Sequence, residues 1–299
     1  MDLTRAEPGT TSRFQENAPV LEHEKVALQT YRLRLHAPGI ARLARAGQFV
    51  MARVRQGTDP LLRRPISFHR ILREEGIIEL LYRVVGRGTW WLSQVRPGET
   101  LSLLGPLGNG FQLPEPLHFP IALIAGGIGI APLYQLILDL VACTREKERS
   151  SVHLFYGART SGELLREGIF QETGISLHLC TDDGSLGYGG RVTEVFQEKA
   201  AAESAKPAVV FSCGPLAMQY HVAKWVTAHG ADSQLSLEAL MACGVGACLG
   251  CALPAVSPDA SGTDHFVHVC KQGPIFKAES IEWTRLQPHP APPPTFLFS

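Results

Sequence analysis

Four cysteines near the C-terminal end constrain this chain more than any other sequence feature. Cys243, Cys248 and Cys251 follow the pattern C-x4-C-x2-C, and Cys270 comes after a segment of hairpin character. This is the plant-type spacing for a [2Fe–2S] cluster held by four thiolates. A loop that wraps around inorganic sulfide needs close backbone approach and positive φ, which glycine permits. Glycines stand between the cysteines at Gly244, Gly246 and Gly250.

Two other interpretations of these cysteines stay open at this point. A structural zinc site usually combines two C-x2-C pairs, and here Cys248 and Cys251 form the only such pair. The third interpretation is four cysteines without any ligand. The spacing, and the glycine-rich loop in which the pair is embedded, favour the iron–sulfur cluster over both.

Charge and hydropathy exclude several classes of function. The 299 residues hold 28 Lys plus Arg and 28 Asp plus Glu, so the formal net charge is zero and gives no general attraction to nucleic acid or acidic membranes. No apolar run approaches the roughly 18 residues of a membrane span, and residues 1–17 lack the apolar core of a signal peptide. Because Cys143, Cys180 and Cys213 lie in separate segments, a reducing cytoplasm fits better than a disulfide framework.

The patterns divide the chain into a barrel, a sheet domain and a small cysteine unit. After a flexible lead-in over residues 1–17, residues 18–113 alternate with period two between turn residues, which predicts a small antiparallel β-barrel. The expected strands are Val20–Ala27, Tyr31–His36, Gln48–Val54 and Ile77–Val85, and the one short helix is Thr89–Val95.

Residues 114–234 change character after a Pro-rich linker at Leu113–Pro116. Strands alternate with helices here, which is typical of an α/β doubly wound parallel sheet. Residues 235–285 then form a small C-terminal [2Fe–2S] domain, and 286–299 are a Pro-rich tail. The expected strands are Ile121–Ala125, Val152–Tyr156, Ser176–Cys180 and Ala208–Ser212. The expected helices are Pro132–Ala142, Gly162–Gln171, Thr193–Ala201 and Pro215–His229.

The predicted barrel carries motifs that suit a bound phosphate. Arg64 and Ser67, in the sequence Arg-Pro-Ile-Ser, place a guanidinium and a hydroxyl where a phosphate and a ring could be held together. Gly88 and Thr89 open the short helix and offer N–H groups to a phosphate. Because surface arginines beside strands are common, the first motif alone leaves an ordinary surface as the alternative. A glycine-rich turn over residues 105–111 ends the barrel.

The first strand of the predicted sheet runs into a glycine-rich turn. Pro132 follows in the first turn of the next helix, where proline is favoured, so a dinucleotide pyrophosphate could approach the helix N-terminus. The pattern departs from G-x-G-x-x-G, and a plain tight turn is the alternative. Cys213 and Gly214 begin another strand–helix turn, at the sheet edge where ligands bind in this architecture. The glycines of the first turn are Gly126, Gly127 and Gly129.

Taken in order, these motifs resemble the ferredoxin–NADP reductase superfamily, in which a flavin-binding barrel precedes a nicotinamide domain. Within it, residues 18–276 resemble the electron-transfer subunit of class 1B dihydroorotate dehydrogenase, which carries FAD and a [2Fe–2S] cluster in the same order. The stretches that carry the resemblance are Arg64–Ser67, Gly86–Thr89, Ala125–Gly129, Cys213–Pro215, Met241–Cys248 and Gly273–Pro274.

The resemblance implies how the barrel would hold FAD. Arg64 would bind the diphosphate and Ser67 would approach flavin N5, while Pro65 and Ile66 would line the isoalloxazine ring. The wider superfamily often has an aromatic residue at the place of Ile66, so this position departs from the pattern. The remaining FAD contacts implied by the resemblance are Leu81, Tyr82, Arg83, Gly88 and Thr89.

The resemblance also implies a nicotinamide site. Cys213 would lie beside the nicotinamide, and the turn after the third strand of the sheet would meet the adenosine ribose. Asp182 and Asp183 stand in that turn, and a carboxylate accepts from a ribose 2′-OH but repels a 2′-phosphate. NAD is therefore expected rather than NADP, although Arg159 at the end of the second strand favours the opposite choice.

Two departures from the family concern the cluster. The family commonly has an acid where this chain has Gln272, and the loop Ser257–Asp264 is long. The cluster ligands themselves, Cys243, Cys248, Cys251 and Cys270, match the family pattern.

The resemblance implies an electron relay that needs no acid–base side chain of this chain. An FMN-containing dihydroorotate dehydrogenase subunit would supply electrons, which would pass through the cluster and FAD to NAD⁺. A two-plus-two heterotetramer is expected, with contact at the small, apolar cluster loop. Two alternatives remain: an NADH-dependent reductase component of an oxygenase, and a zinc-stabilised binding module that is not an enzyme.

Overall fold

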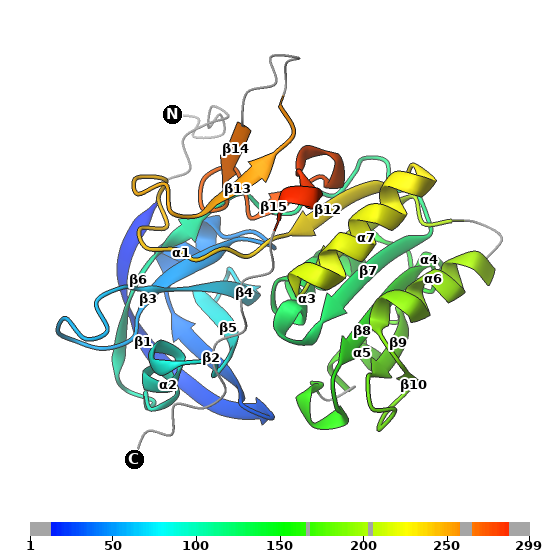
Figure 1. The fold of residues 1–299 in the computed structure, drawn as a ribbon. Coiled ribbons are helices and arrows are strands. Elements are labelled where there is room, and N and C mark those ends of the chain that lie inside the picture. The colour runs from blue at the N-terminus through cyan, green and yellow to red at the C-terminus, as the bar shows by residue number, and fades with distance from the viewer. Residues whose placement is uncertain (1–12, 166–167, 203–205, 258–264, 287–299) are drawn as a thin grey trace, which may run out of the picture.

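Three units lie side by side in the computed structural model, which describes residues 13–165, 168–202, 206–257 and 265–286 (Figure 1). They are a closed barrel, a sheet covered by helices, and a small unit that carries the cysteine loop. The three-part fold predicted from the sequence is confirmed. Among the described residues, no helix is long and apolar enough to cross a membrane.

The barrel is built from six antiparallel strands and two short helices. Its strands are β1 (Phe14–Ala27), β2 (Thr30–His36), β3 (Phe49–Arg53), β4 (Arg64–Leu72), β5 (Ile77–Arg83) and β6 (Thr100–Leu107). They close in the order β1-β2-β5-β4-β3-β6, so no strand edge is left unpaired. The helices are α1 (Pro38–Leu43) and α2 (Arg87–Ser93). Alternate residues such as Leu33, Leu35, Phe68 and Leu80 fill the interior.

The barrel begins earlier in the chain than the sequence predicted. Residues 14–17, which we expected in the flexible lead-in, are part of β1 and pair with β6. Glu16 on this stretch accepts hydrogen bonds from Gly39 N at 3.3 Å and Ile40 N at 3.1 Å, at the start of α1. The acid satisfies free N–H groups at the helix terminus, so a polar residue stands within the strand. The apolar alternation is interrupted there, and the sequence pattern did not predict this part of β1.

The sheet domain has a mostly parallel sheet of seven strands. They are β7 (Ile121–Gly126), β8 (Val152–Ala158), β9 (Ser176–Thr181), β10 (Tyr188–Gly189), β11 (Val209–Cys213), β12 (Asp232–Ser236) and β15 (Ile275–Phe276). The order is β10-β9-β8-β7-β11-β12-β15, and β15 alone runs antiparallel. The chain starts at β7, builds outward to β9 and β10, and then returns to β11. The switch point between β7 and β11 is where such sheets bind ligands.

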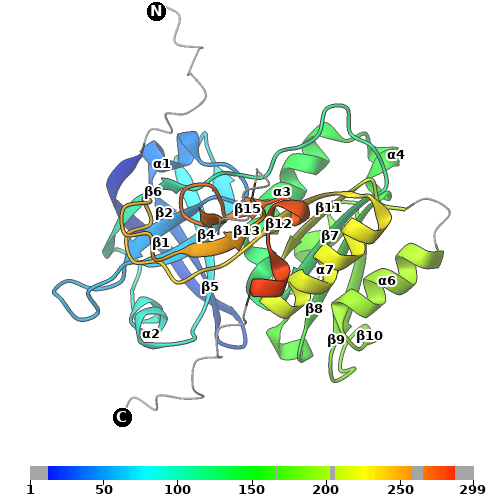
Figure 2. The ribbon, with the colours of Figure 1, turned by 45° about the horizontal axis from the view of Figure 1, so that its top comes forward.

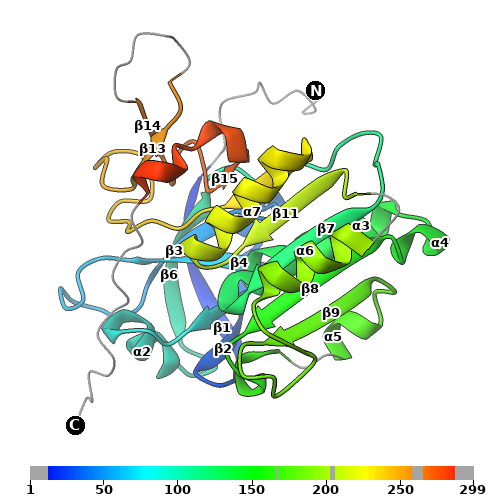
Figure 3. The same ribbon diagram turned by 45° about the vertical axis from the view of Figure 1, so that its right-hand side comes forward.

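Helices cover both faces of this sheet (Figure 3). The elements are η1 (Gly127–Gly129), α3 (Ile130–Cys143), α4 (Glu146–Arg149), η2 (Ser161–Glu163), α5 (Gly168–Gln171), α6 (Val192–Ala202) and α7 (Leu216–His229). Ala122 and Ile124 of β7 pack in the core under α6 and α7. Leu123 and Ala125 pack with α3 on the opposite face, which is turned toward the barrel. Because successive side chains of β7 point to opposite faces, the same strand contributes to the hydrophobic cores on both faces of the sheet.

One expected helix is wrong. The segment Gly162–Gln171 was predicted to be a single helix, but the structure has only η2 and α5 there, with residues 166–167 outside the described ranges. Leu164 leaves η2 with an extended backbone, at φ −78° and ψ 144°. Leu164 and Leu165 are 5% and 6% exposed. The extended backbone allows both neighbouring leucines to be buried.

The cysteine unit shares the sheet of the domain before it. Its own elements are β13 (Ala252–Ala255), β14 (His265–His268), η3 (Ala278–Ser280) and η4 (Trp283–Arg285). Its strand β15 pairs with β12 of the large sheet, and the boundary that we expected after residue 234 falls inside β12. Backbone hydrogen bonds on both sides of β12 therefore join the two units.

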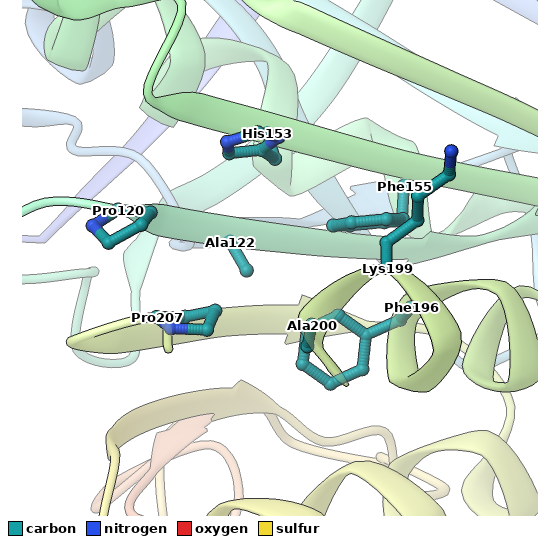
Figure 4. A pocket seen from close by; sticks show the side chains of 8 residues that line it. All are labelled: Pro120, Ala122, His153, Phe155, Phe196, Lys199, Ala200 and Pro207. Carbon is teal, nitrogen blue, oxygen red and sulfur yellow. The ribbon is translucent and has the colours of Figure 1, made fainter. Parts of the chain in front are cut away.

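A hollow of about 270 Å³ lies near the amino ends of β7 and β8 (Figure 4). It is mostly apolar, with one histidine and one lysine at its margin. Since ligands of such sheets bind at the carboxyl ends of the strands, this hollow is separate from the candidate site. It is lined by Pro120, Ala122, His153, Phe155, Phe196, Lys199, Ala200 and Pro207.

Candidate functional site

The loop between β12 and β13 brings cysteine sulfurs together with backbone N–H donors. Gly246 N lies 3.1 Å from Cys270 Sγ, and Cys248 N lies 3.4 Å from Cys243 Sγ. Cys251 Sγ and Cys270 Sγ are 3.3 Å apart. The loop carries Cys243, Cys248 and Cys251 and the adjoining turn carries Cys270, and N–H groups aimed at sulfur stabilise its negative charge. No three His, Cys, Asp or Glu side chains in the described ranges converge as ligands of a single metal ion.

The cysteine sulfurs differ in exposure and ionisation. Cys251 and Cys270 are buried, Cys243 is half-buried and Cys248 is exposed. Burial raises the pKa of the Cys270 thiol to about 12. Burial also opposes ionisation of Cys243, but N–H groups of Val245 and Cys248 outweigh it and lower the pKa of Cys243 to about 6. The loop thus favours a thiolate at Cys243, which is the form that binds iron.

Glycine at position 244 lets the cluster loop fold against the barrel. Gly244 and Gly246 have φ of +72° and +80°. A Cβ on Gly244 would lie 2.5 Å from Met51 Cγ of β3 and 3.3 Å from Leu107 of β6. In Figure 2 the loop lies over the barrel. Only glycine combines the left-handed conformation with this close approach.

At the barrel rim, the structure brings Arg64 of β4 onto Gly88 of α2. A Cβ on Gly88 would lie 2.1 Å from Arg64 Nε, so the guanidinium crosses the helix where no side chain stands. Arg64 Nη1 donates to Leu62 O at 2.5 Å, and burial lowers the pKa of Arg64. Thr89 already donates its hydroxyl to Gly86 O at 3.0 Å, which stabilises the turn into α2. The structure therefore places Arg64 and Gly88, two residues of the predicted phosphate motifs, side by side.

The residues after Arg64 divide between two faces of β4. Pro65 is exposed and Ser67 is half-exposed, whereas Ile66 is 5% exposed and packs in the barrel core. Pro65 pairs with Met51 of β3, so their side chains share the outer face. Since Met51 touches the loop at Gly244, this face leads directly to the cluster site. The role of Ile66 at the flavin ring stays a prediction.

In the next strand, β5, only some of the residues predicted to contact FAD face the cleft. Leu81 and Arg83 line a cleft of about 220 Å³ between the barrel and the sheet. Tyr82 points the other way into the barrel core, where its hydroxyl is 2.8 Å from His23 Nε2. A contact of Tyr82 with FAD would therefore need its backbone. The cleft is completed by Thr30, Gly127, Ile128, Ile130, Tyr156, Glu163 and Leu165.

The two strand–helix turns predicted for the nucleotide meet at the switch point of the sheet. A Cβ on Gly129 would lie 2.1 Å from Cys213 O, and a Cβ on Gly214 would lie 3.0 Å from Gly126 N. Gly127 has φ +54° and an open side toward the cleft. Cys213 is 3% exposed, and burial raises the pKa of its thiol. The structure thus brings these predicted residues together at the carboxyl ends of β7 and β11.

The predicted ribose turn lies two strands away along the same sheet edge. Asp182 N donates to Ala158 O at 3.0 Å and Asp183 N donates to Arg159 O at 3.2 Å, so this turn adjoins the end of β8. Hydrogen bonds from Ser185 lower the pKa of the Asp183 carboxyl. Both acids are exposed, as a side chain that meets a ligand requires.

Three side chains at these sites were missed by sequence reasoning or misjudged. Glu163 binds both Arg83 and Arg159, but it stands in a segment that we expected to be a regular helix. Asn109 joins the barrel to the cysteine unit, and its place between two glycines was the one signal for a special turn. Gln272 Oε1 accepts from His268 N at 2.8 Å, a bond that a carboxylate would make equally. Residues 258–264 and 287–299, part of the long loop and most of the tail, lie outside the described ranges.

The fold and these sites define a class of protein: an electron-transfer flavoprotein with a nicotinamide domain and a cysteine-ligated cluster. Family models match all three parts. Residues 17–111 match the oxidoreductase FAD-binding domain and residues 123–224 match the oxidoreductase NAD-binding domain. Residues 238–282 match the iron–sulfur cluster binding domain of dihydroorotate dehydrogenase B.

Relatives over nearly the whole chain narrow this class to one family. The chain is 40% identical over 267 residues to the dihydroorotate dehydrogenase B (NAD(+)) electron transfer subunit of Desulforamulus reducens, covering 89% of this chain and 98% of that protein. It is 36% identical over 268 residues to the subunit of the same name from Geobacillus kaustophilus, with the same coverage. The chain therefore belongs to the family of dihydroorotate dehydrogenase B electron-transfer subunits.

Solved structures of other proteins share this fold. The NADH-dependent reduced ferredoxin–NADP oxidoreductase structure superposes with a TM-score of 0.77 at 27% identity, covering 93% of this chain and 92% of that chain. The Amycolatopsis cytochrome P450 reductase GcoB reaches a TM-score of 0.60 and covers 73% of this chain and 67% of its own. The three family models confirm the predicted FAD, NAD and iron–sulfur domains. Membership of the family decides against the two alternatives, the reductase component of an oxygenase and the zinc-stabilised binding module.

Proposed function

We propose that this chain carries electrons from an FMN-containing, dihydroorotate-oxidising partner subunit to NAD⁺, as part of pyrimidine biosynthesis in the cytoplasm. The observation that carries the proposal is the contact of the cluster loop with the outer barrel face, where a Cβ on Gly244 would overlap Met51 beside Pro65. The cluster site and the flavin site thus share one face. FAD, when bound, exchanges single electrons with an iron–sulfur cluster and hydride with a nicotinamide.

In this proposal the cysteine loop holds a [2Fe–2S] cluster and shields it from water. The ligands are Cys243, Cys248, Cys251 and Cys270. Backbone N–H groups of Gly246 and Cys248 stabilise the negative charge on the sulfurs, as their 3.1 Å and 3.4 Å contacts support. Packing of the loop on β3 excludes water on the side toward the barrel.

The barrel rim would hold FAD. Arg64 binds the diphosphate, since its planar fork of donors suits two phosphate oxygens and the open backbone of Gly88 gives it room. Ser67, on the outer face of β4, presents its hydroxyl to flavin N5. Leu81 and Arg83 face the same cleft from β5 and contact the cofactor beside it.

The sheet edge would hold NAD⁺. The turn at Gly127 admits the diphosphate, because its open side faces the cleft. Cys213 lies beside the nicotinamide and orients it by packing. Asp182 and Asp183 accept from the adenosine ribose and disfavour a 2′-phosphate by repulsion.

The cluster loop is also the proposed contact with the partner. Leu240 and Leu249 are 75% and 59% exposed, and Ala242, Ala247 and Cys248 beside them are exposed as well. An exposed apolar patch of this kind marks an interaction site. The neutral net charge supports a stable apolar contact over a charge-steered encounter. We propose a two-plus-two heterotetramer in which the partner supplies the dimer axis.

Co-expression with a dihydroorotate-oxidising subunit tests the function. The two chains should elute together at high salt and reduce NAD⁺ with dihydroorotate as the electron source. Leu249→Asp should separate them, because it puts a charge into the apolar contact. Tyr220→Asp, which changes a 40% exposed side chain on α7, is the matched control and should leave the complex intact. Separation of the wild-type subunits, or NADH oxidation that drives an oxygenase instead, would overturn the proposal.

A further inference from the structure

A single carboxylate, Glu163 at the end of η2, joins the barrel to the sheet domain. It accepts from Arg83 Nη2 at 2.9 Å and Nη1 at 3.3 Å. Arg159, from the turn after β8, donates to the same carboxylate from Nη2 at 2.6 Å and Nε at 3.1 Å. The Glu163 side chain is 7% exposed, against 20% for Arg83 and 67% for Arg159. One buried acid therefore holds a guanidinium from each domain.

This carboxylate is charged at neutral pH. Burial alone would raise the pKa of Glu163, but hydrogen bonds from Arg159 and the charge of Arg83 outweigh burial and lower that pKa. The same hydrogen bonds raise the pKa of Arg159. A guanidinium whose N–H fork is already engaged by a carboxylate has fewer donors left for a second anion.

The ion pairs stand at the sheet edge proposed for the nucleotide. Glu163 and Arg83 line the cleft together with Gly127 of the glycine-rich turn. Asp183 N donates to Arg159 O at 3.2 Å, so Arg159 adjoins the acidic turn at the ribose end. Arg159 is thus a largely exposed cation beside the place where a 2′-phosphate of NADP would lie.

We propose that Glu163 is a specificity-determining residue that withholds Arg159 from the 2′-phosphate of NADP(H). An arginine near the adenosine ribose is the side chain that accommodates a 2′-phosphate in dinucleotide-binding sheets. Glu163 prevents this use by engaging Nη2 and Nε of Arg159. The inference rests on the proposed nicotinamide site. It assigns part of the selectivity for NAD over NADP to Glu163, which lies outside the ribose turn.

The test measures ligand binding on the full-length, FAD-loaded chain by isothermal titration calorimetry. The probes are 2′-phospho-AMP and AMP, which differ by the 2′-phosphate alone. Glu163→Gln keeps the volume and removes the charge. It should raise the affinity for 2′-phospho-AMP relative to AMP by about fivefold, the scale of one partly exposed ion pair.

Matched variants assign that gain to Arg159. Adding Arg159→Ala to Glu163→Gln should cancel the gain, because the freed guanidinium is then gone. Glu198→Gln, at an exposed carboxylate of α6, removes a negative charge but leaves Arg159 engaged by Glu163, so the affinity ratio should stay within about twofold of wild type. A gain in Glu198→Gln, or one that survives without Arg159, would overturn the inference, since either would indicate an effect that does not act through Arg159.

A second measurement keeps the inference testable if Glu163→Gln does not fold. Leu28 N donates to Gly162 O at 2.8 Å, a backbone bond that holds η2 to the barrel without Glu163, so folding is expected. In the wild-type background, Arg159→Ala should change the affinity ratio by less than about twofold, because Arg159 is already occupied. A large loss of 2′-phospho-AMP binding there, or an unchanged ratio in folded Glu163→Gln, refutes the role of Glu163. Wild-type protein that binds neither probe would refute the nicotinamide site itself.

Discussion

The barrel meets its two neighbours through different kinds of contact. Toward the cysteine unit, backbone atoms of the two units approach each other directly. A Cβ on Gly108 would lie 2.7 Å from Gly273 O, and Asn109 N donates to that same oxygen at 2.7 Å. Toward the sheet domain the two surfaces leave a cleft of about 220 Å³, with the charged side chains Arg83 and Glu163 among otherwise uncharged lining residues.

One asparagine reinforces the first junction. Asn109 Nδ2 donates to Gln272 O and to Ile275 O, both at 2.8 Å, and its Oδ1 accepts from Ile275 N at 2.9 Å. These bonds fix the segment that follows the predicted ligand Cys270. Asn109 thus anchors the segment after Cys270 to the barrel.

The second junction has one backbone bond, from Leu28 N to Gly162 O, but side chains make its other polar and ring contacts. Gln135 Oε1 of α3 accepts from Ile71 N of β4 at 2.7 Å. The ring of His69 stacks on Tyr134, with centroids 4.5 Å apart. Side chains can rearrange as a ligand enters, whereas closely packed backbone cannot move without breaking strand pairing. The fixed junction suits a resident cluster, and the open junction suits a nucleotide that binds and leaves.

The largest effect is expected from removal of a cluster ligand, which should abolish the cluster and leave FAD binding unchanged. Cys270→Ala should abolish the EPR signal of the reduced cluster, because a [2Fe–2S] cluster needs all four thiolates. FAD should remain bound, since no proposed FAD contact changes, and its absorbance measures this. Cys180→Ala, at a buried cysteine of the sheet domain, is the control and should keep the signal. A normal signal in Cys270→Ala would show that the fourth ligand is another residue.

The second-largest effect is expected from a side chain added at Gly108, where the barrel backbone lies closest to the cysteine unit. Gly108→Ala should destabilise the loaded chain by about 3 kcal/mol in thermal unfolding, from left-handed strain and overpacking together. Gly108 has φ +72°, and its Cβ would lie 2.6 Å from Pro274 Cδ. Gly98→Ala carries the strain alone, with φ +89° and no heavy atom within 4 Å, and should cost about 1 kcal/mol. Equal losses in both variants would contradict a tightly packed junction.

A smaller effect is expected from the asparagine. Asn109→Ala removes three side-chain hydrogen bonds at a half-exposed site, so it should cost about 2 kcal/mol in the same unfolding measurement. It should also speed iron release to a chelator, because the turn after Cys270 loses its anchor. Asn17→Ala, at an exposed position of β1, is the control and should change stability by less than about 0.5 kcal/mol. Unchanged iron release in Asn109→Ala would show that the junction is held without this side chain.

Local signals explain which parts could be predicted from the sequence. The cluster ligands stand in one loop with a fixed spacing, and the glycine-rich turns lie directly between a strand and a helix. The order of the units is also a local property, since period-two and strand–helix patterns follow each other along the chain. These parts need no knowledge of distant contacts.

The parts that failed depend on contacts between distant segments. Asn109 contacts Ile275, 166 residues away, and no pattern near either residue shows this. Strand β5 is buried from Ile77 to Tyr82, so polar alternation could not reveal that Tyr82 faces the barrel core and Leu81 the cleft. Glu163 was hidden for a similar reason, because its partner Arg83 lies 80 residues earlier.

The smallest expected effect belongs to the open junction and depends on pH. Glu163→Gln should lower the free energy of unfolding by about 1 kcal/mol at pH 7, the scale of a partly exposed ion pair. The lowered pKa of Glu163 means that its stabilisation is complete above the ordinary carboxyl range and is lost as pH falls through the folded-state pKa. The difference between wild type and variant should therefore be constant from about pH 6 to 8 and shrink only below about pH 4. Denaturant titrations of both proteins across this range measure the difference in unfolding free energy. The other carboxyl groups contribute equally to both proteins, so their pH dependence cancels in this difference. A difference that changes between pH 6 and 8 would point to a histidine at this junction and would contradict a bridge held by Glu163.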